Sequence, residues 1–104
     1  MNKWYVYSLA DNGYVFYICI TQKPFERYKQ HICAPGYLVD NVINTMLMLN
    51  QWPQMNILCL ADRDQAAIVE IELIYQYCVK GHKICNGLPN MPHNLLIKEK
   101  PAYN

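Results

Sequence analysis

The hydrophobic pattern at the start of the chain predicts two β-strands. Residues 3–9 and 14–20 are rich in aromatic and β-branched residues, and Asp11-Asn12-Gly13 between them is a hairpin signal. We expect a three-residue loop with Gly13 in the left-handed conformation, forming a type I turn with a bulge, in preference to a two-residue Asn-Gly turn that would shift the register by one. In that register Tyr7 lies directly opposite Tyr17, close enough for the two side chains to interact.

A helix is predicted to follow the second strand. Pro24 suits its first position, and Ala34-Pro35-Gly36 ends it. Arg27 and His31 are spaced i and i+4, so they project together from one face of this helix. Its apolar face is predicted to hold Phe25, Tyr28 and Ile32.

The pattern then predicts a helix, a strand and a further helix. A helix is expected over residues 38–50, and the short apolar run 55–60 is typical of a central strand. Asp62 or Asp64 can cap the last helix, which Gly81 would end. One face of the helix over 38–50 is predicted to hold Leu38, Val42, Met46 and Leu49.

Composition indicates one small folded domain. Hydrophobic residues make up 53% and charged residues 16% of the 104 residues, so disorder is not expected. The formal net charge of +1 does not by itself indicate a nucleic-acid binder, so such a protein would need its cations on one face. The densest basic group, for which a solvated helix face is the alternative interpretation, comprises Lys23, Arg27, Lys29 and His31.

The cysteines and the absence of targeting signals suggest a reducing compartment. The chain has five cysteines, an odd number with no C-x-x-C pair, which favours reduced structural thiols. We see no secretory signal and no apolar run of the ~20 residues that a membrane span needs. The expected location is the cytoplasm, or the nucleus of a eukaryotic cell.

One carboxylate stands out on the last predicted helix. Glu72 lies on a mostly polar stripe, but Glu70 lies on an apolar one, where a carboxylate is costly unless it is paired, hydrogen-bonded or bound to metal. The alternative is a partly exposed glutamate bonded to a tyrosine hydroxyl. The residues that share the stripe with Glu70 are Ala66, Ala67, Ile74 and Tyr77.

These features, in this order and spacing, resemble the GIY-YIG nuclease family, and most closely its small single-domain members with a Trp-Tyr-x-Tyr opening. The likeness spans about residues 4 to 86. The matching residues and motifs are Tyr5-Val6-Tyr7, Tyr17-Ile18-Cys19, Thr21, Arg27, His31, Trp52-Pro53, Ala66-x-x-x-Glu70-x-x-x-Ile74 and Cys85-Asn86.

The resemblance implies a small α/β fold, with a three-stranded antiparallel sheet flanked by about three helices, and a DNA endonuclease activity. Tyr7 or Tyr17 would orient or deprotonate the attacking water, and Arg27 would stabilise the charge on the phosphate. Glu70 would be the sole protein ligand of a divalent ion, expected to be magnesium, with manganese as an alternative. His31 would assist proton transfer or hold a tyrosine.

The resemblance also implies supporting roles outside this group. Thr21 and Asn86 would support the site, and Lys23 and Lys29 would contact nucleic acid together with Arg27. The nuclease domain would cover residues 1–86 and residues 87–104 would form an irregular tail or docking arm. A homodimer or a partner protein is compatible with so short a chain.

The chain departs from the family pattern where Cys19 replaces a glycine and where Lys23 stands in place of a capping Asn or Asp. Two alternatives therefore stay open. One is a catalytically silent module of the same fold that binds nucleic acid through aromatic residues and arginine. The other is a zinc-stabilised interaction domain, whose ligands would be Cys78, His82, Cys85 and His93.

Overall fold

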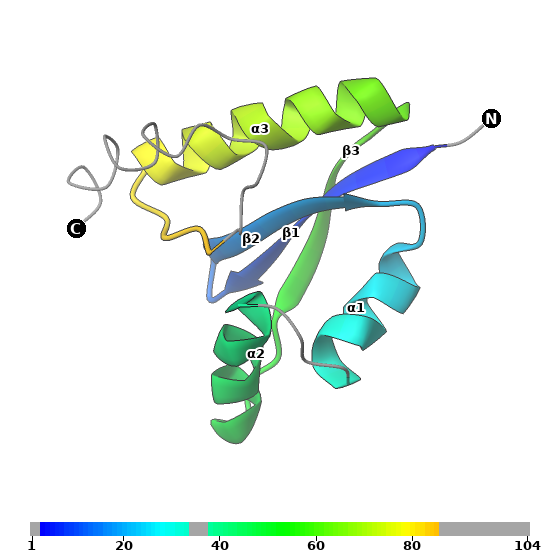
Figure 1. Cartoon of the computed structure of the whole chain (residues 1–104). Coiled ribbons are helices and arrows are strands. Elements are labelled where there is room, and N and C mark those ends of the chain that lie inside the picture. The colour runs from blue at the N-terminus through cyan, green and yellow to red at the C-terminus, as the bar shows by residue number, and fades with distance from the viewer. Residues whose placement is uncertain (1–2, 34–37, 86–104) are drawn as a thin grey trace.

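A computed structural model, which describes residues 3–33 and 38–85 (only the backbone for 38–40), shows a three-stranded antiparallel sheet and three helices (Figure 1). The sheet order is β2-β1-β3. This confirms the predicted fold class, while Asn86 and the proposed tail 87–104 lie outside the described residues. The elements in chain order are β1 (Trp4–Asp11), β2 (Tyr14–Thr21), α1 (Pro24–Cys33), α2 (Leu38–Met48), β3 (Gln54–Ala61) and α3 (Arg63–Val79).

The helices lie on both faces of the sheet, so the sheet separates two apolar layers. Helix α3 covers one face, and α1 and α2 lie against the other (Figure 1). Successive side chains of a strand point to opposite faces. Accordingly Val6 and Ala10 of β1 pack toward α3, whereas Tyr7 and Leu9 pack toward α1 and α2.

The hairpin differs from the sequence prediction. Asn12 (φ 50°) and Gly13 (φ 85°) both have positive φ, so the turn has two residues, as in a type I′ hairpin. Asp11 consequently pairs with Tyr14, and the register shifts between Leu9 and Ala10. The predicted three-residue loop was wrong, because an Asn-Gly pair satisfies the tight turn and the bulge forms further along β2.

This bulge determines the face of the sheet to which Tyr17 points. Leu9 pairs with Tyr17 and Ala10 with Val15, which leaves Phe16 as the extra residue of β2. Phe16 and Tyr17 therefore both pack on the side of α1 and α2. Tyr7 pairs with Cys19, so the predicted direct pairing of Tyr7 with Tyr17 was wrong.

The helix caps follow the sequence closely. Asp62 Oδ1 accepts a hydrogen bond from the Gln65 amide at 2.9 Å and caps α3, and Gly81 (φ 98°) follows its end. Before α1, Thr21 Oγ1 accepts from the Lys23 amide at 3.1 Å. Thr21 thus supports the turn into α1 by holding the amide of Lys23, the residue that precedes the helix.

Two of the predicted apolar faces need correction. Phe25 is 86% exposed, because it lies on the first turn of α1 beside an open groove rather than over the sheet. On α2, among residues 41–48 whose side chains are described, Ile43 is fully buried, whereas Leu49 is 65% exposed and follows the end of the helix. Helical spacing alone does not show which turns of a helix reach the sheet.

Candidate active site

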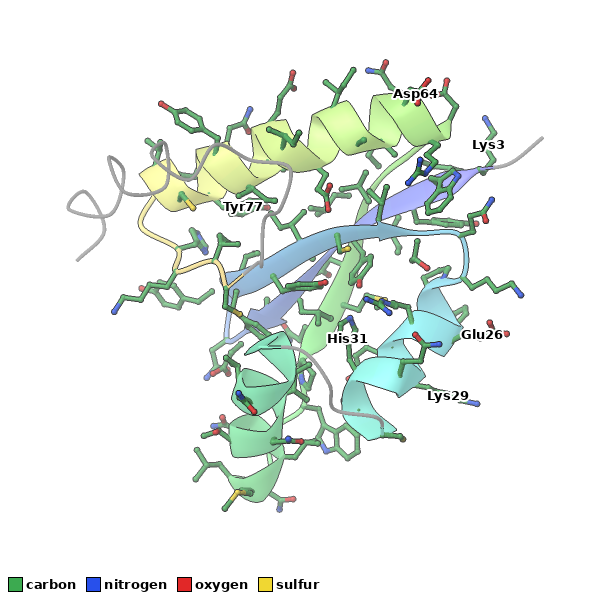
Figure 2. All side chains as sticks on the ribbon, in the orientation of Figure 1. Lys3, Glu26, Lys29, His31, Asp64 and Tyr77 are labelled. Atoms are coloured by element: carbon green, nitrogen blue, oxygen red, sulfur yellow. The ribbon has the colours of Figure 1, made fainter. Side chains whose placement is uncertain are left out.

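Tyr7 is the centre of the candidate site, and α1 supplies its two polar neighbours. Its side chain is fully buried, and its Oη lies 2.9 Å from His31 Nε2. Arg27 Nε donates a hydrogen bond to the same oxygen at 3.4 Å. His31 is itself 2% exposed and lies between α1 and the sheet (Figure 2). The i, i+4 spacing on α1 therefore brings the two groups together, as predicted, and the structure shows that both contact Tyr7.

Tyr17 completes the aromatic part of the site despite the changed register. Its ring centroid lies 6.2 Å from that of Tyr7 and 5.3 Å from that of His31, the latter edge-on. Tyr17 and Tyr7 are diagonal neighbours on adjacent strands, because Tyr17 pairs with Leu9. The bulge at Phe16 is what brings Tyr17 to this face.

Cys19 connects the tyrosines with the carboxylate on α3. The half-buried Cys19 thiol affects the pKa of Tyr7, Tyr17 and Glu70, and hydrogen bonding to it lowers the pKa of the Glu70 carboxyl. Burial has the larger effect and raises the pKa of Glu70 above its ordinary value. Tyr7, Tyr17, Arg27 and His31 therefore form one cluster, and Cys19 interacts both with its tyrosines and with Glu70.

Burial keeps both tyrosines neutral at neutral pH. It raises the pKa of Tyr7 well above 10, and the neighbouring Arg27 lowers this pKa only in part. The pKa of Tyr17 is raised for the same main reason. The net shift of the Tyr7 pKa is upward, because burial outweighs the effect of Arg27. An ionised tyrosine therefore does not fit this site as the base.

The Tyr7 hydroxyl takes part in the hydrogen bonds with both Arg27 and His31. Arg27 Nε can only donate, so the Tyr7 oxygen accepts from it. The Tyr7 hydroxyl can donate to His31 Nε2 when that nitrogen carries no proton, and this is the tautomer that proton transfer from Tyr7 to His31 requires.

The other predicted nucleic-acid contacts lie apart from this cluster. Lys29 is exposed and projects from α1 away from His31 (Figure 2). Lys23 is also exposed, and its Nζ lies 3.8 Å from Glu26 Oε2. Arg27, in contrast, lies at the site, and its Nη1 donates to Gln30 Oε1 at 3.0 Å. Of the three predicted contacts, only Arg27 belongs to the cluster.

The segment after α3 closes the bulge of β2. The Val15 amide donates to His82 Nδ1 at 2.9 Å, and the Phe16 carbonyl accepts from the Cys85 amide at 2.8 Å. Cys85 Sγ donates to the same carbonyl at 3.0 Å. These bonds satisfy the backbone groups that a bulge removes from the strand ladder. His82 and Cys85 thus hold the bulge that orients Tyr17.

Replacing His82 should loosen this bulge. His82→Ala leaves the Val15 amide without its acceptor, and we expect a loss of about 1–3 kcal/mol in the free energy of unfolding, measured by urea denaturation. His82→Asn keeps a side-chain oxygen near the amide and should recover part of the loss. An alanine variant as stable as the parent would show that the bond does not hold the bulge.

The zinc alternative finds no support in this geometry. Cys78 is 3% exposed in the core beneath α3, His82 Nδ1 accepts from Val15, and the Cys85 thiol donates to Phe16. Residues 3–33 and 38–85 contain no group of three or more His, Cys, Asp or Glu side chains placed to hold a metal. His93 lies outside this part of the chain.

Sequence reasoning missed three residues of the site and its support. Cys19 was treated only as a departure from the family pattern, although its i+2 spacing from Tyr17 places both on one face of β2. Gln30 follows Arg27 at i+3, a spacing that could have suggested their bond. The sequence indicated His82 only as a possible zinc ligand, because its bond to Val15 joins residues far apart in sequence.

Comparisons with protein-family models, with curated proteins and with solved structures find no match to this chain. Membership of the GIY-YIG family therefore stays a prediction that depends on the motifs. Among the described helices, none combines the length and apolarity needed to span a bilayer.

Proposed function

We propose that this protein is a metal-dependent endonuclease that hydrolyses phosphodiester bonds in DNA. The observation that carries the proposal is the Tyr7 hydroxyl held between Arg27 Nε and His31 Nε2. Such an arrangement combines an oxygen that can orient water, a base that can take a proton and a fixed positive charge. Phosphodiester hydrolysis requires all three.

Arg27 is the group suited to bind the phosphate. Its guanidinium is held by Tyr7 on one side and by the exposed Gln30 amide on the other. A phosphate oxygen can replace Gln30 as acceptor, because that hydrogen bond is solvent-exposed. The guanidinium then stabilises the charge that develops on the phosphate in the transition state.

Tyr7 and His31 are suited to activate the water together. Because Tyr7 is fully buried, the relay requires that a water molecule enter the site beside Tyr7 Oη, and this water then transfers a proton to that oxygen as it attacks phosphorus. Tyr7 at the same time passes its own proton to His31 Nε2, 2.9 Å away, so Tyr7 stays neutral and His31 becomes the imidazolium. This relay agrees with the raised pKa of Tyr7, because no free phenolate forms.

Glu70 is the residue that would hold the metal ion. Its carboxylate is half buried, and among the described residues only the Cys19 thiol acts to lower its raised pKa. A carboxylate in this state gains from a bound cation, and a single carboxylate oxygen with water in the remaining positions suits magnesium or manganese. When bound, such an ion supplies positive charge for the phosphate and the leaving oxygen.

Tyr7→Phe tests the relay. The variant lacks the oxygen that receives the proton of water, so we expect the cleavage rate to fall about 100-fold or more. The measurement is the initial rate of plasmid nicking in excess Mg²⁺ between pH 6 and 9. Tyr75→Phe, on the outer side of α3, is the matched control and should keep the parent rate. A Tyr7→Phe rate within twofold of the parent would contradict the relay.

A reducing compartment fits this proposal, and we place the protein in the cytoplasm or the nucleus. All five cysteines are free thiols, although Cys33 is exposed. Oxidation of the Cys19 thiol would remove its interactions with Tyr17 and Glu70.

A further inference from the structure

A second cavity opens beside Arg27, outside the Tyr7 cluster. It has a volume of about 330 Å³ and lies where the first strand begins, the second strand ends and α1 begins. Arg27 belongs both to this cleft and to the hydrogen bond with Tyr7, so the cleft adjoins the candidate active site. Its lining residues include Trp4, Thr21, Gln22, Arg27 and Gln30.

The lining combines the three kinds of group that bind a nucleotide. Trp4 offers an aromatic surface on which a base can stack. Arg27 supplies a guanidinium for the adjoining phosphate, and the side-chain amides of Gln22 and Gln30 can donate to and accept from the edge of a base. The volume lies at the lower end of the range for small-molecule sites, so it suits one nucleotide rather than a base pair.

The Trp4 ring is held in place from the side of α3. The Arg63 guanidinium lies 5.3 Å from the ring centroid, a cation–π contact that restrains the ring and adds positive charge beside it. At the rim of the cleft, Lys23 and Glu26 approach each other to 3.8 Å, so the charge of Lys23 is partly balanced. Among the basic residues that line the cleft, Arg27 is therefore the one suited to hold the phosphate, and Arg63 adds positive charge behind the Trp4 ring.

We propose that this cleft binds one unpaired nucleotide next to the phosphate that is cut, with its base stacked on Trp4. The inference rests on the proposed nuclease function and narrows its substrate class. A base that stacks on Trp4 is not paired with a complementary strand. The preferred substrates are therefore single strands, frayed ends or branched DNA, and an intact duplex binds more weakly.

The test is a fluorescence titration of the full chain carrying Trp52→Phe and Glu70→Gln. Trp4 is then the one tryptophan, and binding is measured without cleavage. The probes are a 12-nucleotide oligodeoxythymidylate, an oligouridylate of equal length and a 12-base-pair duplex. We expect the single-stranded DNA to quench Trp4 and to bind at least 10-fold more tightly than the duplex. The oligouridylate, which differs from the oligodeoxythymidylate in its 2′-hydroxyls and in lacking the 5-methyl group of the base, shows whether RNA is bound as well. Binding of either strand requires a base stacked on Trp4.

Two substitutions separate stacking from other effects, with binding followed by the anisotropy of a labelled oligodeoxythymidylate. Trp4→Leu should weaken binding about 10-fold and Trp4→Phe by less than 3-fold, because only the latter keeps a ring. Tyr75→Leu is the control for loss of an exposed aromatic side chain. If Trp4→Leu does not fold, quenching of Trp4 fluorescence in the Trp52→Phe, Glu70→Gln protein still shows whether a base stacks on Trp4.

Absence of quenching, or equal affinity for the duplex and the single strand, would overturn the cleft assignment. Cleavage by the wild-type protein then decides the nuclease proposal separately. A wild type that cuts DNA without any effect of Trp4→Leu on binding keeps the nuclease and loses the cleft. A wild type that never cuts but quenches on single strands keeps the cleft and loses the nuclease.

Discussion

Glu70→Gln should lower the rate of DNA cleavage by about 10³-fold. The substitution keeps the size of the side chain and one of its two acceptor oxygens, replaces the other by an NH2 donor, and removes the negative charge that would hold a divalent ion. Loss of the ion removes several kcal/mol of transition-state stabilisation, and each 1.36 kcal/mol corresponds to a factor of ten in rate. The measurement is plasmid nicking in excess Mg²⁺. Glu72→Gln is the matched control, because Glu72 is exposed on the same helix.

The same substitution should stabilise the fold at neutral pH. Burial raises the pKa of the Glu70 carboxyl, so the folded state favours the protonated form. The stability that Glu70 contributes is therefore present below its unfolded pKa of ~4.3 and is lost as pH rises through its folded pKa. Glutamine is neutral throughout, so the variant should unfold at a higher temperature than the parent at pH 7 and at a similar one at pH 4.

Thermal unfolding with EDTA measures this difference, because the chelator prevents bound metal from stabilising the parent. A Glu70→Gln variant that is less stable than the parent at pH 7 would show that the carboxylate has a favourable partner in the fold. Lower activity combined with higher stability is the pattern expected of a residue that serves the reaction.

Arg27→Lys should reduce cleavage by about 10²–10³-fold, although the positive charge is kept. An arginine presents a planar fork that bonds Tyr7 through Nε and a neighbouring acceptor through Nη1, and a lysine ammonium cannot hold both positions. The loss should appear mainly in kcat, because the charge on the phosphate grows in the transition state. Steady-state kinetics on a fluorescent oligonucleotide would measure kcat and KM separately.

Lys83→Ala provides the control for a change of surface charge, because Lys83 is exposed in the segment after α3. It should keep the parent kcat. An Arg27→Lys enzyme with full kcat would mean that a point charge is sufficient and that the bond to Tyr7 has no role in the reaction.

Local sequence signals predicted the elements well because their causes are local. The Asp62 cap and Gly81 define the limits of α3, and Pro24 begins α1, so these boundaries follow from residues within one turn of each end. The i, i+4 pair on α1 likewise brings Arg27 and His31 to Tyr7 without knowledge of the sheet register.

The register between β1 and β2 could not be predicted from the sequence, because it depends on hydrogen bonds between residues far apart in the chain. At the bulge, the Phe16 carbonyl bonds to Cys85, which lies 69 positions along the chain. The adjacent Val15 amide bonds to His82, which lies 67 positions away. Without that segment, alternation along β2 would carry Tyr17 to the face of α3. The position of Tyr17 in the site is therefore set by a part of the chain that no local pattern connects with it.

Nicking of supercoiled plasmid by the wild-type protein, with Mg²⁺ and with EDTA, tests the central claim most directly. Glu70→Gln, Arg27→Lys and the control Glu72→Gln would be measured beside it. We predict cleavage by the wild type and Glu72→Gln in Mg²⁺ alone, with both site variants nearly inactive. A wild type that retards DNA in a gel but never cuts it, or cutting that survives both site substitutions, would contradict the account.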